Sequence, residues 1–87
     1  MISDDVLAQL ERLSDQCDAA PWRALVEGRD FESGDSFIKT GDGSTRGEDI
    51  YVTRDSGPAS VAYLDLIAAA RTWLPELIAE VREARRS

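Results

Sequence analysis

Few residues in this chain could carry out chemistry. Its 87 residues include no histidine, one cysteine and one lysine. Histidine is the commonest general base, so a serine, threonine or cysteine nucleophile would need a carboxylate or the lysine as its partner. Cys17 lies near the expected C-terminal end of a helix, where the negative potential disfavours a thiolate, and Lys39 lies in an expected strand. We therefore predict that the chain is not an enzyme and uses no cofactor.

A glycine-rich segment is the stretch whose composition suits a phosphate group. The sequence Gly-Asp-Gly-Ser-Thr-Arg-Gly over 41–47 lacks the Lys-Ser/Thr ending of a P-loop and is expected to join two strands. A flexible hairpin loop is therefore the favoured interpretation. The alternative is a small-ligand site for a phosphate or nucleotide, built from Gly41, Gly43, Ser44, Thr45, Arg46 and Arg54.

Acidic residues gather in the middle of the chain. Their spacing does not follow the alternating D-x-D-x-D-G order of a calcium loop, so we predict no metal site. They would lie on strand ends and loops, either as a solvated face or as a surface that docks on a basic patch of another protein. An exposed tryptophan could add an interface anchor. The predicted partner-binding residues are Glu27, Asp30, Glu32, Asp35, Asp42, Glu48, Asp49 and Trp73.

The excess negative charge is confined to the first two thirds of the chain. The net charge is −7, from 17 acidic and 10 basic residues, and residues 58–87 hold four of each sign. Such a field repels phosphate backbones and anionic membranes, so we expect a protein partner with a basic surface and no direct nucleic-acid binding. No apolar run approaches the roughly 20 residues that cross a bilayer, and the first residues lack the features of a signal peptide, so we expect a cytoplasmic protein.

The pattern of apolar residues predicts the elements that position these groups. Helical spacing after Ser3 predicts an amphipathic helix over about 4–17. Three β-rich groups, 22–27, 36–40 and 49–53, are separated by turn residues and predict a three-stranded antiparallel meander. The whole chain, 1–87, is long enough for one domain of the α+β class.

The last third predicts helix. Pro58 suits a first helical position after Ser56 or Gly57, and Pro75 would interrupt the pattern. We expect two helices, roughly 58–72 and 75–86, or a single helix kinked at Pro75. Because a domain of this size buries limited surface, a homodimer is a further expectation. The apolar stripe that could serve as core or as a homo-oligomer interface comprises Trp73, Leu74, Leu77, Ile78 and Val81.

Two segments resemble a known group of proteins. They are the Ala-Ala-Pro-Trp string over 19–22 and the stretch Asp-Leu-Ile-Ala-Ala-Ala-Arg-Thr-Trp-Leu-Pro-Glu-Leu-Ile-Ala-Glu-Val over 65–81. Together they resemble small proteins of actinobacterial phages and prophages, loosely grouped as Ead/Ea22-like. The chain departs from that pattern at Leu66, where a phenylalanine is usual, and at Trp73, where a smaller residue is typical. The resemblance implies an accessory protein of a mobile element and supplies no catalytic residues.

Overall fold

The first helix begins where the sequence predicts. In the computed structural model, which describes residues 1–86, α1 spans Asp4–Asp15. The Ser3 side chain accepts a hydrogen bond from the Val6 N–H at 3.2 Å. Asp4 and Asp5 occupy the first turn, where the helix dipole favours negative charge. The predicted N-terminal helix is confirmed, and it ends two residues before position 17.

Two of the three predicted strands pair as expected. Strands β1 (Trp22–Leu25) and β2 (Phe37–Thr40) form an antiparallel ladder in which Trp22 lies opposite Thr40. Ala24 and Ile38 also face each other in this register, and both are buried. This small sheet supplies the apolar face on which the rest of the core is built.

The third strand of the predicted meander does not form. Ile50 pairs with Ile38 through two backbone hydrogen bonds of 2.8 and 2.9 Å, and the ladder stops at that single bridge. The next carbonyl that could extend it, that of Val52, accepts a hydrogen bond from the Ala59 N–H instead. The chain after Ile50 therefore pairs with itself, and the expectation of a strand over 49–53 in a three-stranded sheet is wrong.

That self-pairing produces a second, very short sheet. Strands β3 (Thr53–Arg54) and β4 (Gly57–Pro58) are joined by a two-residue turn, and Gly57 has a φ of 131°, which favours glycine. Pro58 therefore ends a hairpin and does not begin a helix. Helix α2 starts three residues later, and the Ser60 carbonyl accepts hydrogen bonds from the amides of residues 63 and 64.

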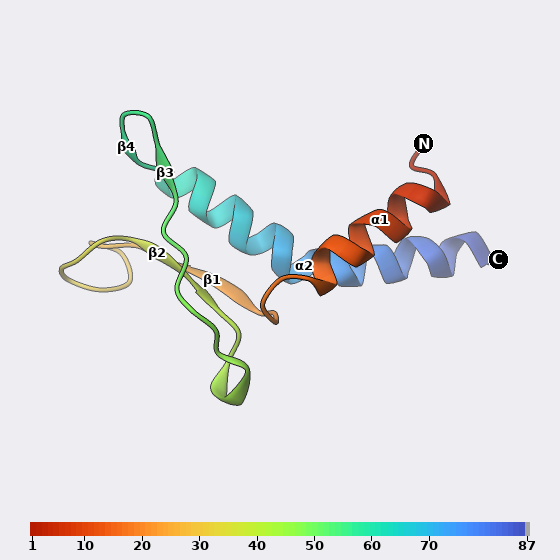
Figure 1. Ribbon diagram of the computed structural model, residues 1–87, viewed down its shortest axis with the longest axis horizontal. Coiled ribbons are helices and arrows are strands. Elements are labelled where there is room, and N and C mark those ends of the chain that lie inside the picture. Colours follow the sequence, from red (N-terminus) through yellow and green to blue (C-terminus); the bar gives the residue numbers. More distant parts are fainter. Residues whose placement is uncertain (87) are drawn as a thin grey trace.

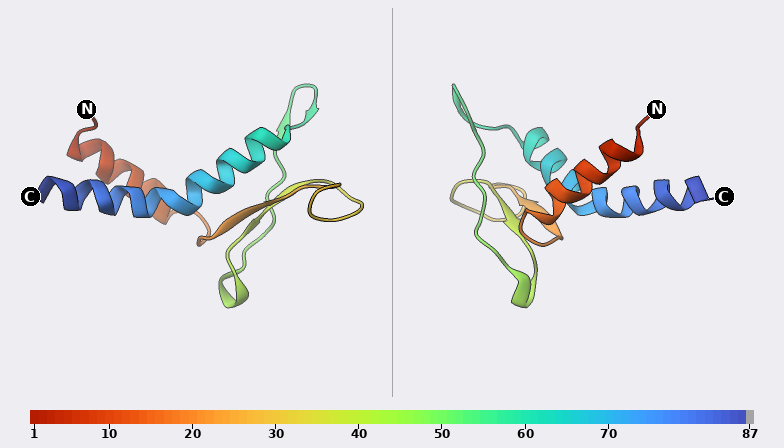
Figure 2. Two further views of the ribbon diagram at one scale, coloured as in Figure 1. Left: turned by 180° about the vertical axis from the view of Figure 1, so that it is seen from behind. Right: turned by 45° about the vertical axis from the view of Figure 1, so that its right-hand side comes forward.

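The C-terminal segment is one helix. Helix α2 spans Val61–Arg86 without interruption and contains Pro75. Figures 1 and 2 show that it changes direction near its middle, as expected for a helix-interior proline that removes one backbone hydrogen bond. The kinked form of the prediction is therefore the one observed, and the division into two helices is wrong.

The two halves of α2 have different partners. The first half covers the β1–β2 sheet, where Leu64 and Ala68 join Ala24, Val26 and Ile38 in the buried core. The second half runs antiparallel to α1, with Leu7 and Ile78 buried. We call α1 together with this second half the arm. The arm projects from the sheet, so the radius of gyration is 15.2 Å, compared with about 12 Å for a compact chain of this length.

A hydrogen-bonded junction joins the arm to the sheet near the bend of α2. The Thr72 hydroxyl accepts from the Trp22 N–H at 2.9 Å and donates to the Trp22 carbonyl at 3.0 Å. The neighbouring Arg71 guanidinium donates to the Ser14 hydroxyl at 2.9 Å and to the Asp18 carbonyl at 3.0 Å. It also lies 5.8 Å from the centre of the Trp22 ring. Helix α1, the linker, β1 and α2 thus meet at one place.

Replacing the hydroxyl in this junction tests its contribution to stability. We expect Thr72→Val to lower the free energy of unfolding by about 1–3 kcal/mol, because a backbone N–H in a partly buried site loses its acceptor while side-chain shape is preserved. Urea unfolding measures the change. Thr53→Val, on the exposed strand β3, is the control and should leave the midpoint unchanged. Equal midpoints for the two variants would contradict this role.

Candidate functional site

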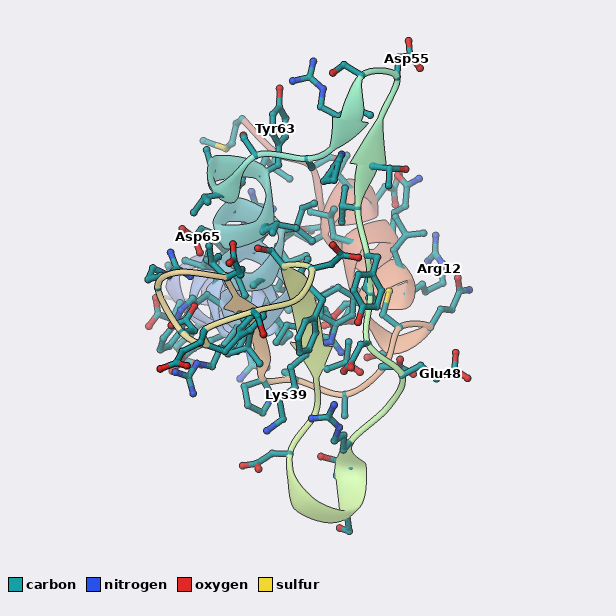
Figure 3. The ribbon with its side chains drawn as sticks, turned by 90° about the vertical axis from the view of Figure 1, so that its left-hand side faces the viewer. Arg12, Lys39, Glu48, Asp55, Tyr63 and Asp65 are labelled. Carbon is teal, nitrogen blue, oxygen red and sulfur yellow. The ribbon has the colours of Figure 1, made fainter. Side chains whose placement is uncertain are left out.

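The predicted acidic residues do not form one surface. Glu27, Asp30, Glu32 and Asp35 lie in the loop between β1 and β2, at one end of the hairpin. The other three, Asp42, Glu48 and Asp49, flank the 3-10 turn η1 (Gly43–Thr45) beyond the opposite end. Figure 1 shows the two loops projecting in different directions, and Glu48 is labelled beside the second loop in Figure 3. The structure therefore brings together four of the seven residues.

Two of the seven carboxylates form ion pairs with arginines. Asp30 accepts from the Nε of Arg29 at 3.0 Å, and Asp49 accepts from Arg46 at 2.7 Å. Among residues 1–86, the side chains of Glu27, Glu32 and Asp35 form no such ion pair and are exposed. Of the five carboxylates in this set that form no such ion pair within residues 1–86, three thus lie in the β1–β2 loop and two, Asp42 and Glu48, lie beside η1.

Aromatic rings lie beside these free carboxylates. The Phe31 and Phe37 ring centres are 6.0 Å apart, and those of Phe37 and Tyr51 are 5.6 Å apart, both in tilted arrangements. Tyr51 is more than half exposed. This row was not predicted from the sequence, because its members come from a loop, a strand and the segment after the Ile50 bridge. We define the loop face as Glu27, Glu32, Asp35, Phe31, Phe37 and Tyr51.

Arg29 forms ion pairs with Asp30 of the loop and with Asp65 of α2, and these pairs hold the loop against the helix. We call the three residues the ion-pair bracket. Arg29 donates to both carboxylate oxygens of Asp65 at 2.9 and 3.0 Å, and Asp30 accepts from the Val26 N–H at 2.8 Å. The Arg29 hydrogen bond lowers the pKa of Asp65 below its ordinary value. The Val26 N–H, followed by Arg29, lowers the pKa of Asp30, and the two carboxylates raise the pKa of Arg29. Asp65 is labelled in Figure 3 beside this loop.

Trp73 lies far from the acidic loop. It is on the arm, 57% exposed, and lines a groove with Glu76, Leu77 and Glu80. Of the predicted stripe around it, Leu77 is also exposed, whereas Ile78 is buried and Leu74 and Val81 are half-buried. The structure therefore places the predicted aromatic anchor and the predicted acidic set at opposite ends of the molecule.

The glycine-rich loop is closed on itself. Its Gly41 N–H donates to the Pro21 carbonyl and its Gly47 N–H to the Thr40 carbonyl. The Thr45 hydroxyl accepts a hydrogen bond from the Asp42 N–H at 2.8 Å. Ser44 is exposed and lies with Gly43 in the turn η1. Most amides that could cradle a phosphate thus already have acceptors.

The two arginines of the predicted ligand set are separated. Arg46 pairs with Asp49, whereas Arg54 lies on β3 with its guanidinium carbon 4.9 Å from the centre of the Tyr63 ring. Figure 3 shows Tyr63 at the opposite end of the view from the loop that holds η1. The structure does not bring Arg54 to the glycine-rich loop.

The described residues contain neither a cluster suited to a metal ion nor a helix suited to crossing a membrane. Within the described residues 1–86, no group of three or more His, Cys, Asp or Glu side chains could hold a metal ion. Within the same residues, no helix is both long enough and apolar enough to cross a bilayer. Cys17 is exposed, and its thiol donates to the Leu13 carbonyl at 3.4 Å.

Comparison with known proteins adds no family. No protein-family model, no curated protein and no solved structure matches the chain. Likeness to phage accessory proteins therefore stays a prediction, and the geometry of the chain itself must support any functional proposal.

The ion-pair bracket gives a pH-dependent prediction. Because both aspartate pKa values are lowered by folding, their stabilising contribution is present above the unfolded pKa and is lost as the pH falls through the folded pKa. We expect acidification below about pH 4 to loosen the loop. Asp65→Asn should reproduce that loosening at neutral pH, seen as faster hydrogen exchange of the Val26 and Asp30 amides. Asp55→Asn, at the tip of the β3–β4 hairpin, is the control. If the Val26 and Asp30 amides exchange at an unchanged rate in Asp65→Asn, the ion pair with Asp65 does not hold the loop.

Proposed function

We propose that this chain is a non-enzymatic protein-binding domain of the phage accessory type, which docks its loop face on a basic surface of a protein partner such as a host or defence factor. The observation that carries the proposal is the combination of three carboxylates without ion pairs, Glu27, Glu32 and Asp35, with an aromatic row in the same part of the fold. Aromatic side chains supply contact area at interfaces, and unpaired charges steer the encounter.

The conformation of the loop supports this use. The Glu27 N–H donates to the Ser36 hydroxyl at 3.0 Å, and the Gly28 N–H donates to the Phe31 carbonyl at 2.8 Å. The Arg29 bracket adds a second attachment, to α2. A loop already held in one conformation loses less entropy on binding, so more of its contact energy appears as affinity.

Charge also supports a basic protein over other partner classes. Ion pairs with Arg29 and Arg46 neutralise two of the seven carboxylates, and three of the five that remain, Glu27, Glu32 and Asp35, lie at the loop end. A negative end of this kind attracts a basic surface and repels the phosphate groups of nucleic acid.

Affinity capture with matched charge variants tests this function. The chain is immobilised and exposed to a bacterial lysate at low and at high salt, and retained proteins are identified by mass spectrometry. We expect a protein with a basic surface to be retained at low salt. The combined variant Glu27→Gln, Glu32→Gln, Asp35→Asn should lose it, with affinity reduced by about tenfold or more.

A second triple variant serves as the control for net charge. Asp42→Asn, Glu48→Gln, Asp55→Asn removes the same number of charges from exposed positions outside the loop face. It should retain the partner. Equal loss in both variants would show that net charge alone attracts the protein, and no specific retention by the unmodified chain would refute the proposed function.

A further inference from the structure

The arm exposes an apolar face that nothing within residues 1–86 covers. Its members, exposed between 40% and 57%, are Val6 and Leu13 of α1 and Trp73 and Leu77 of α2. We call these four residues the arm face. Isolated exposed apolar residues are ordinary on protein surfaces, but a contiguous group of large ones marks an interaction site.

Helix geometry places these residues on one side of the arm. At about 100° per residue, Val6 and Leu13 are displaced by about 100–120° from the buried Leu7, and Leu77 is displaced by about 100° from the buried Ile78. The displacement has the same rotational sense on both helices. In an antiparallel pair, that puts both groups on the same face.

The ion pair between α1 and α2 is rotated away from the buried contact in the sense opposite to the arm face. Glu11 and Arg82, which are 3.3 Å apart, are each offset by about 40° from Leu7 and Ile78 in the opposite sense. The charged pair therefore lies on the reverse side of the arm. One side of the arm is apolar and the other is ion-paired.

The spacing of the arm face matches helix-to-helix packing. Trp73 and Leu77 continue a 4-3-4 spacing that begins at Leu66 and Ala70 in the first half of α2, and residues 6, 10 and 13 follow a 4-3 spacing along α1. Apolar residues at alternating intervals of four and three form the seam through which α-helices pack on one another. The occupant that this face fits is a pair of α-helices with the same spacing.

The amount of exposed surface is consistent with such an occupant. The accessible area is 6342 Å², about 1,200 Å² more than the roughly 5,100 Å² expected for a monomer of this mass. A standard protein interface covers about 800 Å² on each partner, so the excess can accommodate one. Helix α2 carries four acidic and four basic residues, whereas α1 carries four acidic residues and one basic residue, so each copy brings one neutral helix and one helix of net charge −3 to the interface.

We propose that the arm face is covered by the arm face of a second copy of this chain, giving a twofold-symmetric dimer with four helices at its interface. A twofold interface uses the same patch on both subunits, and a row of exposed apolar residues with helical spacing, bordered on α2 by Glu76 and Glu80, meets that requirement. The inference is independent of the proposed function, because the loop face lies at the other end of the molecule (Figure 1).

Measuring the mass in solution tests the dimer. Sedimentation equilibrium of the full chain should give twice the 9.6 kDa chain mass. Leu77→Glu should weaken dimerisation by at least about tenfold, because it places a charge in the seam. Ala79→Glu makes the same change in charge on the reverse side of the same helix and should leave the mass unchanged. Leu13→Glu and Ala8→Glu provide the same comparison on α1, because Ala8 is displaced by about 100° to the other side of Leu7.

Several outcomes would overturn the proposal. They are a monomer at high concentration, an open series of larger species, and dissociation that Ala79→Glu causes as strongly as Leu77→Glu. Circular dichroism checks that the variants fold. If Leu77→Glu unfolds, hydrogen exchange of the unmodified chain decides, since the amides of α1 and of residues 73–84 should be more protected at high than at low concentration. The triple variant of the loop face should remain dimeric.

Discussion

The contact between Thr72 and the backbone of Trp22 is the constraint on which the arrangement depends. It uses both backbone groups of Trp22, next to the point where Arg71 reaches Ser14 of α1. Because these partners are 50 and 57 positions apart in the sequence, this one place fixes where the linker, the sheet and the bent helix meet. Helix α1 has a defined position relative to the sheet only because both are attached to the same turn of α2.

The bend of α2 separates the molecule into two ends with different surface chemistry. Beyond one end of the sheet lies an acidic and aromatic loop held by Arg29 and Asp65. At the other end lies a two-helix arm with an apolar side and an ion-paired side. A small α+β chain that folded around one compact core would have buried much of this surface, and its exposure is what suggests that the chain acts by binding.

Local signals predicted the elements better than their assembly. Ser3 and the helical spacing after it predicted α1, and the short β-rich groups predicted β1 and β2. The third strand failed because the Val52 carbonyl bonds to Ala59, a contact that strand propensity does not encode. The seven acidic residues were grouped because they are close in the sequence. The ion pair of Arg29 with Asp65, by contrast, spans 36 positions. The apolar side of the arm is likewise formed only when the two helices pack together.

The attachment of α1 has a consequence for how the chain folds. Helix α1 packs on the second half of α2 across a loop of more than 50 residues, whereas the first half of α2 packs on both strands of a hairpin that forms from local contacts. Closing such a loop costs conformational entropy that local contacts do not incur. Helix α1 should therefore dock last and open first, as a cooperative unit that can detach while the sheet and the first half of α2 stay folded.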